Sequence, residues 1–156
     1  MAIKFETTKF PQMEIGNLLA QNYGEHILSV EIEEDTPNGY ICKLGKMKKL
    51  DLWAMEEATA IDAYIALKDA AGRFLVVIND PKDCAVIYQK PLNPYENPKA
   101  LANANFYNDP ADGAVRAYEL HKHDRFWLTA DAFDGDEPAV DKTITTVTDG
   151  KLVVNA

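Results

Sequence analysis

The chain has 156 residues, 47% hydrophobic and 26% charged, which is the size and composition of one globular domain. Sixteen basic residues against 25 acidic ones give a formal net charge of −9. A surface of this charge repels phosphates and anionic lipids, so we expect neither nucleic acid nor a membrane as partner. No run approaches the ~18 consecutive apolar residues of a membrane span.

Residues 1–23 differ from the rest, and we treat them as an N-terminal segment ahead of a β-rich domain at residues 24–156. The apolar residues of the segment follow neither the period of a strand nor that of a helix. They are Phe5, Phe10, Met13, Ile15, Leu18 and Leu19. Two interpretations stay open: a segment folded onto the domain with a helical turn near residues 17–22, or an arm that docks on a partner.

The first strands are predicted from alternating side chains. Residues 26–33 alternate between apolar and polar, which indicates a half-buried strand. Thr36–Gly39 predicts a turn, and residues 40–44 predict a returning strand. We interpret the lysines that follow as a solvated strand edge, because lysine protects exposed strands from pairing. They are Lys43, Lys46, Lys48 and Lys49.

The middle of the chain contains a continuous apolar strand. Residues 54–67 fit a helical face and a strand face equally well, and we predict a strand from Ile61 onward. Phe74–Ile78 is apolar throughout and predicts a buried central strand. Residues 84–89 predict the next strand. Cys42 and Cys84, the two cysteines of the chain, both lie in strand-like runs, so we predict buried thiols and no disulfide framework.

Pro91–Pro110 breaks the strand pattern with repeated proline and asparagine. A segment this polar and proline-rich predicts a long surface loop, and such loops in compact domains are usually functional. Tyr95, Phe106 and Tyr107 are its aromatic residues, placed either to hold the loop down or to face a partner.

The last third returns to strands, at residues 115–120, 126–129, 143–148 and 152–154. The final two flank Asp149-Gly150 and form the clearest hairpin signal in the chain. Four turn dipeptides punctuate the sequence: Asn38-Gly39, Asp112-Gly113, Asp134-Gly135 and Asp149-Gly150. The predicted fold is therefore mainly β, a single-domain barrel or sandwich with an N-terminal segment and a long Pro/Asn-rich loop.

His121 and His123 are the first candidates for metal chemistry. Positions two apart on a strand project to one face, so both imidazoles could meet one ion. A third ligand does not stand nearby in the sequence, and we therefore predict an exposed strand end with two histidines and no metal site.

Other catalytic arrangements are weaker. A dense carboxylate patch does not match the EF-hand spacing, and we interpret it as a solvated acidic turn. Its members are Asp131, Asp134, Asp136 and Glu137. Ser29, the single serine, lacks nucleophile-elbow glycines, while a meeting of Cys84 with a histidine in space stays open. We predict no catalytic residue, no cofactor and no enzymatic activity.

A resemblance to a known family is carried by the opening ten residues and by four later stretches. The stretches are Met1–Phe10, Arg116–Leu120, Asp124–Thr129, Ala132–Gly135 and Asp149–Val154. They resemble head (capsid decoration) proteins of tailed bacteriophages, which are encoded close to the major capsid protein. The resemblance implies a β-rich virion component, without catalytic residues, that binds the outside of the shell and stabilises it.

From this resemblance we expect the major capsid protein as partner, a homo-oligomer being compatible with the role, and the virion as location after assembly in the host cytoplasm. The chain carries no signal-peptide stretch in Met1–Glu6, which agrees with that location. The candidate partner-binding residues are Phe5, Phe10, Met13, Ile15, Tyr95, Phe106 and Tyr107.

Three alternatives remain. One is another virion part, such as a head fibre or tail component. The second is a small-ligand or carbohydrate-binding β-barrel with aromatic residues around a pocket. Those aromatics are Trp53, Tyr88, Tyr95, Tyr107 and Trp127. The third is a metal-dependent enzyme built on His121, His123 and the acidic turn.

Overall fold

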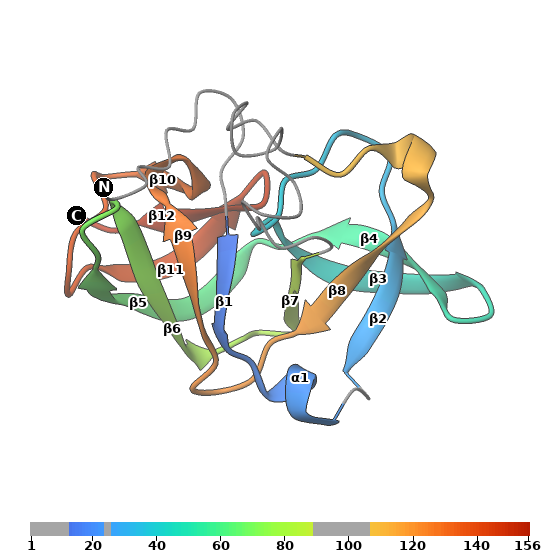
Figure 1. Ribbon diagram of the computed structural model, residues 1–156, viewed down its shortest axis with the longest axis horizontal. Coiled ribbons are helices and arrows are strands. Elements are labelled where there is room, and N and C mark those ends of the chain that lie inside the picture. The colour runs from blue at the N-terminus through green and yellow to red at the C-terminus, as the bar shows by residue number, and fades with distance from the viewer. Residues whose placement is uncertain (1–12, 24–25, 89–106) are drawn as a thin grey trace.

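The computed structural model describes residues 13–23, 26–88 and 107–156. Two β units pack side by side: a closed five-stranded barrel and a seven-stranded sheet (Figure 1). The predicted mainly-β fold is confirmed. Of the helices in the described ranges, none has the length and apolar character needed to cross a membrane.

The barrel closes in the order β2-β4-β3-β7-β8. Its strands are β2 (Ile27–Glu31), β3 (Ile41–Lys49), β4 (Leu52–Glu57), β7 (Cys84–Ile87) and β8 (Ala114–Glu119). Strand β2 pairs in parallel with β4 and antiparallel with β8. The interior holds a small apolar cluster: Val30, Ile32, Cys42, Ala85, Ile87, Val115 and Ala117.

The sheet has the order β1-β9-β6-β5-β11-β12-β10. Its strands are β1 (Met13–Asn17), β5 (Ala60–Lys68), β6 (Arg73–Asp80), β9 (Arg125–Thr129), β10 (Phe133–Gly135), β11 (Thr143–Thr148) and β12 (Lys151–Val154). Short helical turns complete the fold: α1 (Leu19–Tyr23), η1 (Pro110–Asp112) and η2 (Ala130–Ala132). Strand β6 lies between β5 and β9, as the apolar run at residues 74–78 predicts.

Strand β7 joins the two units, because all four of its side chains are buried. Cys84 and Val86 belong to the large core that the barrel shares with the sheet, whereas Ala85 and Ile87 fill the barrel interior. Alternate residues of a strand point to opposite faces, so one short strand serves both cores.

Two turn dipeptides differ from the prediction of hairpins. Asn38-Gly39 turns the chain after β2, but no β2–β3 hairpin forms. In the barrel, the two neighbours of β2 are β4 and β8. Asp134-Gly135 lies inside β10, which runs parallel to β12. Residues 54–67, whose pattern fits both a helix and a strand, lie mainly in β4 and β5. The strand predicted from Ile61 onward is therefore confirmed.

The Asp149-Gly150 hairpin between β11 and β12 is confirmed, with φ of 48° and 73° at the two turn residues. A Cβ at Gly150 would also collide with the ring of Tyr40. We expect Gly150→Ala to lower the free energy of unfolding by about 2–4 kcal/mol, from backbone strain plus overpacking.

The matched control is Gly72→Ala. Gly72 has a similar φ of 83° but open space where its Cβ would stand. It therefore reports the backbone cost alone, about 1–2 kcal/mol. Urea unfolding of both variants measures the difference. Equal losses in the two variants would mean that the Tyr40 contact contributes nothing.

Cys42 and Cys84 are free and buried, as predicted. Burial raises the pKa of the Cys42 thiol to about 12 and that of the Cys84 thiol to about 11. The Cys84 thiol donates to the carbonyl oxygen of Ala60 at 3.2 Å, which links β7 to β5. Buried neutral thiols are poor nucleophiles, so a catalytic pairing of Cys84 with a histidine is not favoured.

We expect both thiols to resist a thiol-specific reagent near pH 8 in the folded protein and to react fully in denaturant. Because both pKa values in the folded protein exceed the ordinary thiol pKa of 9.0, the neutral thiols stabilise the fold below pH 9. That contribution is lost as the pH rises from 9 toward 12. Rapid labelling of the native protein at pH 8 would contradict the burial.

Candidate functional site

Of the residues that the sequence assigns to partner binding, the structure describes the side chains of Met13 and Tyr107. Met13 is buried in the large core, with 3% of its surface exposed, so its assignment to a docking surface is corrected. Strand β1 reaches this position because its backbone pairs with β9, Met13 opposite Leu128 and Ile15 opposite Phe126. Tyr107 is 38% exposed. The remaining candidates, Phe5, Phe10, Tyr95 and Phe106, lie outside the described residues.

The end of the long loop is anchored beside the first turn. Asn108 is buried and its side-chain amide donates to the carbonyl oxygen of Thr36 at 2.9 Å and to Asn38 Oδ1 at 3.2 Å. Its backbone pairs with Thr36 as well. The chain is therefore held in place at Asn108 before it continues toward the barrel strand β8.

Among the described aromatic residues of the ligand-binding alternative, Trp53, Tyr88 and Trp127 lie in different parts of the fold. Trp53 packs against the barrel interior, and Tyr88 meets Tyr118 edge to face at 6.1 Å in the shared core. Trp127 lies in the sheet, with the Arg73 guanidinium 5.7 Å from its ring. This placement gives no support to a sugar-stacking platform made by these rings.

The clearest exposed apolar feature is the tip of the β3–β4 hairpin, which projects from the barrel (Figure 1). Lys49 pairs with Leu52, so Leu50 and Asp51 form the turn. Leu50 is 88% exposed and Met47 is 49% exposed. Turn positions favour Gly, Asn and Asp, so a fully exposed leucine there has no structural explanation in turn chemistry.

Lysines surround this tip, which we call the hairpin tip (residues 46–51). Lys46, Lys48 and Lys49 are exposed, in agreement with the predicted solvated edge. Lys43 differs from that prediction, because it is half-buried and pairs with both β4 and β7. Strand β7 pairs with β3 over residues 41–43, so the rest of β3 has β4 as its one strand partner among the described strands. The hairpin tip is thus locally basic in a chain of net charge −9.

An acidic cleft of about 320 Å³ lies next to the hairpin tip. It is lined by Glu31, Glu33, Glu34, Asp35, Thr36, Tyr40, Lys48, Ala54 and Met55. Glu31 and Lys48 form an ion pair of 2.8 Å across it. Their hydrogen bond and charges lower the pKa of Glu31 and raise the pKa of Lys48, so both groups stay charged near neutral pH.

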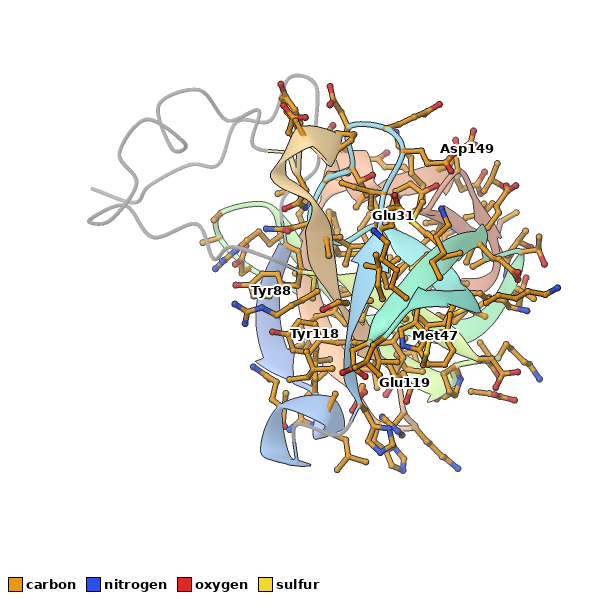
Figure 2. All side chains as sticks on the ribbon, turned by 90° about the vertical axis from the view of Figure 1, so that its right-hand side faces the viewer. Glu31, Met47, Tyr88, Tyr118, Glu119 and Asp149 are labelled. Atoms are coloured by element: carbon orange, nitrogen blue, oxygen red, sulfur yellow. The ribbon has the colours of Figure 1, made fainter. Side chains whose placement is uncertain are left out.

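A second group of polar side chains gathers where β2 begins and β8 ends. One ligand-type atom from each of His26, Glu119 and His121 lies within 4.8 Å of the others. His26 Nδ1 is 2.7 Å from Glu119 Oε2, and the two imidazole rings meet edge to face at 4.7 Å. Figure 2 shows Glu119 near one end of β2 and Glu31 near the other.

The prediction of an exposed strand end that carries both His121 and His123 is corrected. Residues 121–124 form a turn rather than a strand end, with the Asp124 N–H donating to the carbonyl oxygen of His121 at 3.1 Å. His123 has a φ of 73° and is exposed, whereas His121 faces His26. The side chains that meet His121 in space are Glu119 and His26, and His26 lies 95 positions earlier, a proximity with no local signal in the sequence.

Asp124 is the buried carboxylate that holds this turn, with 3% of its surface exposed. Its Oδ1 accepts from the N–H of Leu19 at 2.9 Å, and its Oδ2 accepts from the N–H of His121 at 2.8 Å. One side chain therefore ties α1 and the end of β8 together.

Comparison with protein-family models, with curated proteins and with solved structures finds no match for this chain.

We expect Asp124→Ala to lower the free energy of unfolding by about 2–5 kcal/mol, because two amide donors lose a buried acceptor. Asp124→Asn keeps one acceptor oxygen and should lose less. Denaturant unfolding of the two variants tests this order. If Asp124→Ala is as stable as the parent protein, water replaces the carboxylate and the turn is not held by it.

Proposed function

We propose that this chain is a structural protein of a tailed-bacteriophage virion that binds the exterior of the capsid, a decoration protein. The sequence resemblance at Arg116–Leu120, Asp124–Thr129 and Asp149–Val154 supports the family. The closed barrel supports the role, because closure leaves edge strands only in the sheet, at β1 and β10, and fewer edges reduce aggregation before assembly.

The observation that carries the proposal is the exposed hairpin tip. Leu50 and Met47 place apolar surface at the far end of a two-stranded projection, away from both cores. Binding energy at protein interfaces is concentrated in a few residues that become fully buried on contact. A projecting leucine supported by a paired hairpin is such an anchor, already ordered before it binds.

The charge of the hairpin tip indicates the character of the surface it meets. Lys48 is paired with Glu31, but Lys46 and Lys49 are exposed at the hairpin tip, so the complementary site is an apolar pocket with an acidic rim. The rest of the chain is acidic, which orients the tip toward that site during approach. Many identical pockets on one shell would strengthen a weak single contact when bound copies are linked.

We expect Leu50→Ser combined with Met47→Ser to weaken co-sedimentation with expanded capsids by about tenfold or more, because the anchor is lost. Leu67→Ser is the matched control, since Leu67 is 54% exposed on β5, away from the hairpin. The measurement is the bound fraction against protein concentration. If the full chain does not bind capsids at all, the proposal is wrong.

The lysines are tested separately by salt. Lys46→Glu with Lys49→Glu should weaken binding at low ionic strength and flatten its salt dependence, whereas the exposed Lys151→Glu serves as control. An unchanged salt dependence would contradict the acidic rim.

The N-terminal segment and the long loop remain proposed contacts as well. Because β1 and Leu18 are part of the large core, a truncation at Asn22 would damage the fold, so the test removes residues 1–12 instead. A second form shortens the loop within residues 91–106. If either deletion abolishes binding while the Leu50 variant binds normally, the contact lies there and not at the hairpin tip. Retention of a small ligand through purification without capsid binding would favour the binding-module alternative.

A further inference from the structure

We propose that His26, Glu119 and His121 form a binding site for a divalent transition-metal ion, with Zn²⁺ as the best match. Two imidazoles and one carboxylate are a ligand set that zinc takes in proteins, with water in the fourth position. The site lies outside the hairpin tip and does not depend on the proposed capsid-binding function.

The distances suit this ion. Ligand bonds of about 2.0–2.2 Å in a tetrahedral arrangement put neighbouring ligand atoms about 3.3–3.5 Å apart. In the structure, His26 Nδ1 and Glu119 Oε2 are 2.7 Å apart, and all three ligand atoms lie within 4.8 Å of one another. Small side-chain rotations would reach the bound geometry, and the part-exposed side chains of His26, Glu119 and His121 leave room for them.

The backbones that carry these ligands are fixed. The Glu119 N–H donates to the carbonyl oxygen of His26 at 2.9 Å, and the Leu120 N–H donates to that of Cys84 at 3.0 Å. Asp124 holds the N–H of His121. Ligands on such a frame lose little freedom when a metal binds, which favours affinity.

An ion pair alone does not account for the cluster. The His26–Glu119 contact explains two of the three side chains, but His121 Nδ1 is buried and finds no hydrogen-bond partner among the described residues. Its nearest carboxylate oxygen, Asp124 Oδ2, is 3.8 Å away, beyond hydrogen-bond range. Buried polar atoms without partners are rare, and a bound metal would resolve this cluster by drawing both imidazoles and the carboxylate onto one centre.

The test is calorimetric titration of the chelator-treated full chain with ZnCl₂ at neutral pH. We expect one ion per chain. Replacing Zn²⁺ by Co²⁺ should give the visible absorption of a tetrahedral site. His26→Ala, His121→Ala and Glu119→Gln should each lower the affinity by at least about tenfold, since even residues behind metal ligands cost that much. His123→Ala, an exposed histidine in the same turn, should bind like the parent.

Circular dichroism of the metal-free variants shows whether each one folds. If His121→Ala unfolds, Glu119→Gln and His26→Ala carry the test, because their side chains are 38% and 39% exposed. The proposal is overturned if the parent protein binds no stoichiometric zinc, or if the three variants bind as tightly as the parent. Equal losses in His123→Ala and His121→Ala would place the metal elsewhere in the turn and also overturn it.

Discussion

The double burial of β7 is the constraint on which the rest of the structure depends. Its four residues, Cys84–Ile87, are the shortest strand of the barrel, yet they fill two hydrophobic cores at once. A polar residue on one face of β7 would disrupt the core on that face. It would also weaken the core on the other face. Pairing with β3 and β8 fixes β7 in the barrel, so separating the barrel from the sheet would expose Cys84 and Val86, which pack in the shared core. The barrel and the sheet therefore pack on one shared core.

Both candidate sites are carried by strands that pair with β7. Strand β3 leaves β7 after Lys43 and continues as the free hairpin that ends at Leu50. Strand β8 pairs with β7 as far as Glu119, which lies opposite Ala85, and the Leu120 N–H donates to the carbonyl oxygen of Cys84. In β3 the residues paired with β7 are held in place and those beyond them are exposed, whereas in β8 the half-buried Glu119 lies beside β7 itself. This division follows from burial alone, since binding groups need solvent access while their support needs a core.

Local pattern predicts the strands of this protein well and their partners poorly. Alternating apolar and polar side chains predict β2, the apolar run predicts β6, and Asp149-Gly150 predicts the β11–β12 hairpin. Each of these signals lies within a few residues. Pairing of β2 with β4 and β8 depends on how apolar faces fit across the barrel, which no local pattern contains. Met13 is misjudged for the same reason: its burial follows from pairing with β9, more than a hundred positions later. The leucine in the β3–β4 turn was a readable signal, since turn chemistry does not call for it.

The two candidate sites sit at opposite ends of one strand. His26 precedes β2, and Glu31 ends it in an ion pair with Lys48 of the hairpin. Five residues of strand put these ends about 17 Å apart, beyond the range in which substitutions usually interact. The intervening residue Val30 is fully buried, so the strand itself is not free to move. A metal at His26 would therefore stabilise the barrel without changing the structure of the hairpin tip. Metal binding and capsid binding can accordingly be measured independently, each in variants that lack the other site.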